Sequence, residues 1–421
     1  MYEVTQLSNG TRIATAHMPQ MASVSLGIWS GSGSRHESAS LNGVSHFIEH
    51  VLFKGTSRRN AKEISESVEG IGGYLNAFTS EENTCYYAKA RADKWEILAD
   101  VLMDMYLNPS FDRDEVEKER EVIREELAMY LDQPSQHVLE LLNEVLWPNH
   151  PLGRCITGTN SSIDRLKAGD LRRYWKKHYV SSNTIIVIAG PLEHQTVVKK
   201  LSKYARRITK GKLPSWKPIK LIQHSPQFQI RPKHSEQIHL AFGIKTSSRH
   251  DEHRYSLRLL NTMLGENMSS RLFQRLREDH GLAYTVYSNL GFFDDTGFLT
   301  IAAGIDAAHL EKSMELIHDT LLEFCRKKPL RKELNQARDY LIGQLDLHLE
   351  NTENHMIWLG EQILGFGKPF PSSLIRERLM AVTGEEVNRT ANLFFKPENL
   401  NLAIVGKVAK KRIQVLQNWL Q

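Results

Sequence analysis

Two histidines and a glutamate lie close together in the segment SHFIEHVLFKGT, residues 45–56. His46 and His50 are four residues apart, so on a helix their imidazoles would lie on one side and could share one Zn²⁺ ion. Glu49 comes directly before the second histidine, where its carboxylate could face a metal-bound water and act as a general base. These residues and their spacing predict half of a metal centre, which still needs a third ligand.

The same segment predicts a helix of about three turns, with Asn42 as its N-cap and Gly55 as its stop. Its apolar residues follow the spacing i, i+3, i+4, i+7, i+8 and form one stripe: Val44, Phe47, Ile48, Val51 and Leu52. The two histidines and the glutamate then fall on the opposite face, about 140° to 240° around the axis from the start of the stripe. A solvated polar face is the alternative, but the order H-x-x-E-H is that of the inverzincin metal sites.

The best source of a third ligand is the segment FDRDEVEKEREVIREELAMY, residues 111–130. It predicts a long amphipathic helix, in which Glu119 and Glu126 each follow an apolar stripe residue by three positions and therefore flank the buried face. Glu125 falls on the far side and is expected to be solvated. Periodicity alone leaves both Glu119 and Glu126 open as the ligand.

Segments of the first half of the chain recur in the second half at one spacing of about 216 residues. The matching pairs are 23–29 with 238–244, 111–127 with 329–345, and 183–190 with 399–406. This order predicts a duplicated domain. Aligning HVLF (residues 50–53) with TMLG (residues 262–265) pairs His46, Glu49 and His50 with Arg258, Asn261 and Thr262. The match of 111–127 with 329–345 pairs Glu119 and Glu126 with Ala337 and Gln344. The second half is therefore expected to keep the fold and to lack the metal.

Residues 206–220 separate the halves and contain two prolines, six basic residues and no acidic one, which is typical of a linker. We expect a first domain over 1–208, a linker over 209–221 and a second domain over 222–421. Alternating strand patterns and amphipathic helices follow one another without regular β–α alternation. The predicted class is α+β, with two homologous α/β sandwich domains and mostly antiparallel sheets.

Composition excludes several other classes of protein. The 421 residues are 41% hydrophobic and 24% charged, as in globular proteins, and the net charge of +5 is not gathered into a basic run that would favour nucleic acid. The longest apolar run, residues 185–189, is far shorter than the roughly 20 residues of a membrane span. The N-terminal sequence carries no signal pattern, which predicts a cytoplasmic protein. Three scattered cysteines argue against a disulfide framework.

The segments HFIEHVLFKGT, GIGGYLNAFTSEENTCYY and EKEREVIREEL, in this order, resemble the M16 family of zinc peptidases, which includes pitrilysin, insulin-degrading enzyme and the mitochondrial processing peptidase β subunit. The short duplicated chain is similar to the M16B branch, and the resemblance implies a LuxS/MPP-like metallohydrolase fold in each half. It also implies that His46, His50 and Glu126 bind Zn²⁺, that Glu49 is the catalytic base, and that Glu119 supports the site.

The resemblance extends to residues that would hold a substrate. Asn76, Ala77 and Phe78 match an edge strand that binds an extended peptide. Arg277 and Tyr284 in the second half match a pair that holds the scissile carbonyl and its oxyanion. Without the resemblance, residues 76–78 would be interpreted as part of an ordinary strand after a glycine turn. Arg277 would be a cation that favours a helix C-terminus, and Tyr284 an aromatic residue in a strand.

The sequence therefore predicts a zinc metalloendopeptidase that cleaves peptides or extended, unfolded segments. Because one chain carries both the metal ligands and the Arg/Tyr pair, an active homodimer is expected. The alternative is a subunit like the processing peptidase β chain, or a leader-peptide maturation protease, acting with a partner chain. A non-catalytic core subunit is disfavoured because the metal motif is intact.

Overall fold

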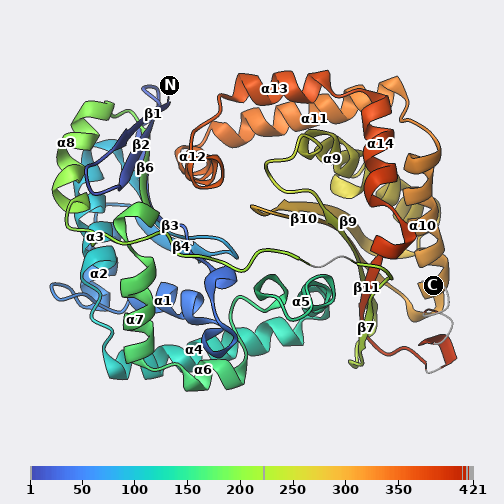
Figure 1. Ribbon diagram of the computed structural model, residues 1–421, viewed down its shortest axis with the longest axis horizontal. Coiled ribbons are helices and arrows are strands. Elements are labelled where there is room, and N and C mark those ends of the chain that lie inside the picture. The colour runs from blue at the N-terminus through green and yellow to red at the C-terminus, as the bar shows by residue number, and fades with distance from the viewer. Residues whose placement is uncertain (1, 221–222, 410, 414–415, 417–421) are drawn as a thin grey trace. The chain divides into compact units, whose positions relative to one another are not determined.

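The computed structural model describes residues 2–220, 223–409, 411–413 and 416 of the chain (Figure 1). The described residues form two compact units. Unit 1 comprises Met1–Leu127, Arg154–Lys217 and Asp346–Pro369, and unit 2 comprises Ala128–Gly153, Pro218–Leu345 and Phe370–Gln421. Residues 221 and 222, at the predicted edge of the second domain, lie outside the described residues.

Unit 1 contains one six-stranded sheet. Its order is β1 (Tyr2–Gln6), β2 (Arg12–His17), β6 (Thr184–Gly190), β3 (Ser23–Ser30), β5 (Thr84–Arg91) and β4 (Tyr74–Thr79). Neighbouring strands are antiparallel except for β2 and β6, which are parallel. Strand β4 therefore lies at an edge of the sheet.

Unit 2 contains a five-stranded sheet in the order β7 (Phe228–Arg231), β11 (Asn401–Val405), β8 (Ile238–Thr246), β10 (Gly297–Ile305) and β9 (Ala283–Phe292). Its one parallel pair is β7 with β11. This is the order β2–β6–β3–β5–β4 of unit 1, with the parallel pair in the same place. The predicted duplication and the α+β class with mostly antiparallel sheets are confirmed.

Helices pack on both sheets and bury a hydrophobic core in each unit. Those of unit 1 are α1 (Val44–Leu52), α2 (Ala61–Glu69), α3 (Trp95–Leu107), α6 (Asn160–Arg165), α7 (Ala168–His178), α8 (His194–Ala205) and α12 (Thr352–Phe366). Those of unit 2 are α5 (Pro134–Leu146), α9 (Arg254–Asn261), α10 (Leu310–Arg326), α13 (Ser372–Ala381) and α14 (Gly384–Phe394). Helices α4 (Arg113–Asp132) and α11 (Arg331–Leu349) each run across a boundary between the units. Among the described helices, none is both long and apolar enough to cross a membrane.

The two halves of the sequence exchange one helix each. Helix α5 belongs to the first half but packs on β8 and β11 of unit 2, where Leu142 fills the space that a side chain at Gly243 would take. Helix α12 belongs to the second half but packs on β3 and β6 of unit 1. The compact units thus differ from the predicted division at residue 208. An amphipathic pattern shows that a helix has a buried face, but not which sheet covers that face.

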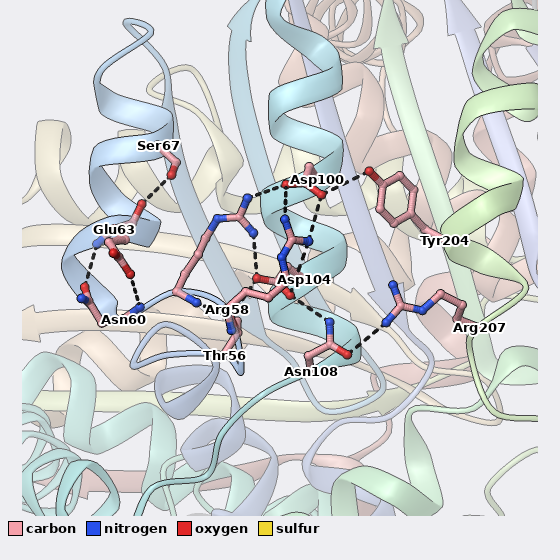
Figure 2. Close-up of polar contacts among 11 residues, drawn as sticks. Thr56, Arg58, Asn60, Glu63, Ser67, Asp100, Asp104, Asn108, Tyr204 and Arg207 are labelled. Carbon is pink, nitrogen blue, oxygen red and sulfur yellow. Dashed lines mark hydrogen bonds and ion pairs between the residues drawn. The ribbon is translucent and has the colours of Figure 1, made fainter.

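The loop after α1 is fixed to α3 by paired arginines and aspartates (Figure 2). Arg58 donates two hydrogen bonds of 3.2 Å to the Asp100 carboxylate, and Arg59 binds both Asp100 and Asp104. Thr56 also donates to Asp104, at 2.8 Å. Burial alone would raise the pKa of Asp100, but the hydrogen bonds from the two arginines outweigh burial and lower it.

Because α12 packs on the sheet of unit 1, adding a methyl group at Gly360 should destabilise that unit. A Cβ at Gly360 would lie 2.3 Å from the ring of Trp29, which is fully buried. We expect Gly360→Ala to destabilise unit 1 by about 1–3 kcal/mol, because an overpacked core must shift. The matched control is Gly343→Ala in α11, where nothing lies within 4 Å and the helix should gain about 0.5–1 kcal/mol. Thermal unfolding midpoints should therefore move in opposite directions, and equal shifts would contradict this packing.

Removing the Asp100 charge should give a pH-dependent loss of stability. A carboxyl whose pKa is lowered on folding stabilises the protein above its ordinary pKa and loses that effect as the pH falls through the lowered value. We expect Asp100→Asn to cost about 1 kcal/mol at pH 7 and progressively less below about pH 4. Chemical denaturation across pH measures this, with Asp93→Asn in an exposed pair as the control. A deficit that stays constant down to pH 3 would contradict the assignment.

Candidate metal centre

Three side chains of unit 1, carried by two helices, converge at one point. His46 and His50 lie on α1, and Glu126 lies on α4. Oε2 of Glu126 is 3.6 Å from Nε2 of His46 and 3.5 Å from Nε2 of His50. The two imidazole centroids are 4.6 Å apart. The histidines predicted to share one face of a helix therefore do so, and a carboxylate faces them.

This arrangement fits a tetrahedral zinc ion. Two ligands at the Zn–N and Zn–O distances of about 2.0–2.1 Å lie roughly 3.3–3.4 Å apart, close to the separations observed here. Two imidazoles and one carboxylate leave a fourth position for water, as in catalytic zinc sites. Throughout the described residues, His46, His50 and Glu126 form the sole group of three such side chains whose ligand atoms all lie within 4.8 Å of one another. Periodicity left Glu119 and Glu126 open, and the geometry favours Glu126.

The two imidazoles differ in charge. Burial, with a smaller effect from His50, lowers the pKa of His46 to about 4. Burial also disfavours the charged form of His50, but hydrogen bonds to Glu119 and Glu126 outweigh it and raise its pKa to about 9. Without a metal, His50 therefore carries the proton at neutral pH. Metal binding requires the neutral imidazole, so the ion would take the place of this proton.

Glu119 contacts His50 at the ring nitrogen that does not face Glu126. Its Oε2 lies 3.1 Å from Nδ1 of His50, and its Oε1 lies 2.7 Å from the ammonium of Lys54. Burial of Glu119 would raise its pKa, but the hydrogen bonds with His50 and Lys54 outweigh this and lower it. An ionised carboxylate here fixes Nδ1 as the donor and leaves Nε2 for the metal.

Glu49 is adjacent to the ligands but stands apart from the converging group. Its Oε2 accepts a hydrogen bond of 2.5 Å from the hydroxyl of Thr79, the last residue of β4. Burial raises the pKa of Glu49, and the Thr79 hydrogen bond partly offsets that effect. A half-buried carboxylate whose pKa is raised is a stronger proton acceptor than an exposed one.

The N-terminus of α1 is capped differently from the prediction. The N-cap is Gly43, with φ of 92°, rather than Asn42. The buried carboxylate of Glu37 accepts hydrogen bonds of 2.8 Å from the backbone N–H groups of Gly43 and Ser45, and the Asn42 amide also donates to it. Burial raises the pKa of Glu37 to about 7, and these hydrogen bonds work against that rise. The side chain of an acidic residue six positions before the N-cap thus replaces the predicted Asn42 cap.

The other predicted residues fall into two groups. Asn76, Ala77 and Phe78 lie in the middle of the edge strand β4 in unit 1. Arg277 and Tyr284 lie in unit 2, where the guanidinium of Arg277 is 5.5 Å from the ring of Tyr284 and the Tyr284 side chain is exposed. Arg277 is in a π-helical segment, Phe273–Asp279, and Tyr284 is near the start of β9.

Sequence reasoning missed three residues whose side chains contact helix α1 or a predicted site residue: Glu37, Lys54 and Thr79. Each lies in or beside a recognised segment, but each acts on another element through its side chain. Alternation along β4 places Thr79 on the same face as Ala77, and that face packs against α1. The strand pattern could therefore have suggested Thr79, whereas nothing local indicated Glu37 as a cap.

Comparison with known families gives two matches along the chain. The family described as insulinase (peptidase family M16) matches residues 12–160. The family described as the peptidase M16 inactive domain matches residues 165–341. The first match contains His46, His50 and Glu126, and the second covers the part of the repeat that lacks these ligands.

Similar proteins and structures agree with these matches. The uncharacterized zinc protease YmxG of Bacillus subtilis (strain 168) is 40% identical over 403 residues, covering 94% of this chain and 96% of that protein. An uncharacterized zinc protease of Mycobacterium leprae (strain TN) is 34% identical, and the match covers 97% of this chain and 92% of that protein. The crystal structure of a protease from Helicobacter pylori has a TM-score of 0.90 at 20% identity, covering 97% of this chain and 99% of that one. The crystal structure of a peptidase M16 inactive domain from Pseudomonas fluorescens has a TM-score of 0.89 at 18% identity, covering 97% of this chain and 98% of that one. Two family matches and two relatives above 30% identity along nearly the whole chain establish that it belongs to peptidase family M16.

Proposed function

We propose that this chain is a zinc-dependent endopeptidase of the inverzincin type that cleaves peptides or extended, unfolded segments. One observation carries the proposal: the ligand atoms of His46, His50 and Glu126 converge at zinc spacing while the carboxylate of Glu49 lies beside them without joining them. That combination supplies a metal position and a separate base, which are the two requirements of metal-assisted peptide hydrolysis.

Strand β4 is the proposed substrate-binding element. As an edge strand it has one side unpaired in the sheet, and an extended peptide can add there through main-chain hydrogen bonds. Asn76, Ala77 and Phe78 form its central part, and Thr79 at its end contacts Glu49. A peptide bound in this way would lie next to the base, and main-chain recognition would demand little of its sequence.

When bound, the zinc ion would polarise the scissile carbonyl and make the attacking water more acidic. Glu49 would accept a proton from that water as the new C–O bond forms. It would then give the proton to the amide nitrogen as the C–N bond breaks. Glu119 would keep the Nε2 atom of His50 directed at the metal position throughout, and its contact with Lys54 would keep Glu119 ionised.

Arg277 and Tyr284 are proposed to bind the oxyanion that develops on the scissile carbonyl. The support is the family pattern together with the closeness of the two side chains within unit 2. A guanidinium and a phenol are suitable donors to such a charge.

The proposed state is an active homodimer, because this chain carries both the metal ligands and the Arg/Tyr pair. The alternative is a processing-peptidase-like subunit or a leader-peptide maturation protease that needs a different partner chain. A non-catalytic interaction subunit is disfavoured by the complete ligand set and the adjacent Glu49.

Replacing the base should separate metal binding from hydrolysis. We expect Glu49→Gln to retain about one zinc ion per chain, because Glu49 is not a ligand, and to lose a factor of about 10²–10⁴ in peptide hydrolysis. Metal analysis and cleavage of a mixed peptide library measure the two effects separately. Cleavage at the wild-type rate would refute Glu49 as the base.

Replacing the third ligand should instead weaken zinc binding itself. We expect Glu126→Gln to raise the zinc dissociation constant by more than about 100-fold, since loss of an outer-shell partner alone costs about 10–100-fold. Competition with a chromophoric chelator gives this constant. Glu125→Gln, one position away on the exposed side of α4, is the matched control and should bind zinc like the wild type. If the two variants bind equally well, Glu126 is not a ligand.

A further inference from the structure

We infer that Thr79 is a positioning residue, which orients the base Glu49 and fixes it to the strand that binds the substrate. This inference rests on the proposed function. The Thr79 hydroxyl lies 2.5 Å from Oε2 of Glu49, across the gap between β4 and α1. Both side chains are half-buried, which limits competition from water. A hydrogen bond to a charged acceptor in such a place is stronger than one between neutral groups.

The hydroxyl of Thr79 has one proton, and its neighbours direct that proton to Glu49. Thr84 faces Thr79 across the hairpin, with the two hydroxyl oxygens 3.5 Å apart. Thr84 already donates its own proton to the backbone carbonyl of Ser32, at 2.9 Å. The carboxylate of Glu49 is much the closer acceptor for Thr79. The network therefore gives the Glu49 carboxylate one fixed donor.

The hairpin end that carries Thr79 is anchored on its other side. The carbonyls of Ser80 and Glu81 accept hydrogen bonds from the backbone N–H groups of Ser34 and Arg35. The buried guanidinium of Arg35 also binds Glu82, at 2.7 Å. Gly33 allows this close approach, because a Cβ there would lie 2.0 Å from the Ser80 carbonyl oxygen. Thr79 is thus held by backbone contacts that do not involve Glu49.

In this proposal, strand β4 both binds the substrate and orients the base. The backbone of β4 would set the register of the added peptide, and its last side chain sets the direction of the base. A base within hydrogen-bond reach but wrongly directed is inefficient, since proton transfer depends on geometry as well as on pKa. Loss of the Thr79 hydroxyl should therefore lower kcat and leave KM nearly unchanged.

The test compares two replacements that remove opposite parts of the side chain. Thr79→Val keeps the shape and removes the hydroxyl, whereas Thr79→Ser keeps the hydroxyl and removes the methyl group. We expect Val to lower kcat about 10–100-fold with KM within about threefold, and Ser to stay within about threefold of the wild type in both. Zinc content should be unchanged in both variants, and both should remain folded at the assay temperature. A merely structural role for Thr79 predicts the reverse order, because Val fills the site and Ser leaves a gap.

A double variant tests whether Thr79 acts through Glu49. In a Glu49→Gln background, Thr79→Val should cause no further loss of kcat, since the base that it orients has been removed. Additive losses, or a Val variant as active as the wild type, would overturn the inference. If the zinc-loaded wild type cleaves no peptide of the library, the proposed function fails instead, so the two failures are distinguishable.

Discussion

The proposed zinc site depends on one spatial requirement: donor atoms from two separate helices must lie together, and those of His46, His50 and Glu126 all lie within 4.8 Å of one another. Helix α1 can supply only two of them, because its opposite face is needed for the core of unit 1. The third comes from α4, and the carboxylate of Glu126 reaches both imidazoles. Any tilt or slide of either helix by more than a few tenths of an ångström would break a zinc site of this kind.

Much of unit 1 can be understood as support for this convergence. The carboxylate of Glu37 closes the N-terminus of α1, and the arginine–aspartate network fixes the loop that follows its C-terminus. Glu119 on α4 contacts both His50 and Lys54, which are four residues apart in the sequence. Each of these contacts includes a charged group or a buried carboxylate. Hydrogen bonds of this kind are stronger than neutral ones and hold their partners in a specific geometry.

The sequence was sufficient for features that depend on local period and order. Helical spacing placed His46, Glu49 and His50 on one face, and the repeat predicted a duplicated fold, which the corresponding five strands of the two sheets confirm. Features that depend on tertiary packing could not be predicted from the sequence. The exchange of α5 and α12 between the units, and the replacement of Asn42 by Glu37 as the cap of α1, depend on which surfaces meet after folding. Periodicity treats Glu119 and Glu126 alike, so the choice of Glu126 came from the family resemblance, and the distances to both imidazoles favour the same residue.

Anomalous diffraction at the zinc absorption edge, from crystals of the zinc-loaded protein, tests the proposed zinc site directly. We expect one strong peak at about 2.0–2.2 Å from Nε2 of His46, Nε2 of His50 and the carboxylate of Glu126, with Glu49 beyond bonding distance. A zinc ion bound directly by Glu49, or located away from these three side chains, would contradict the proposed site.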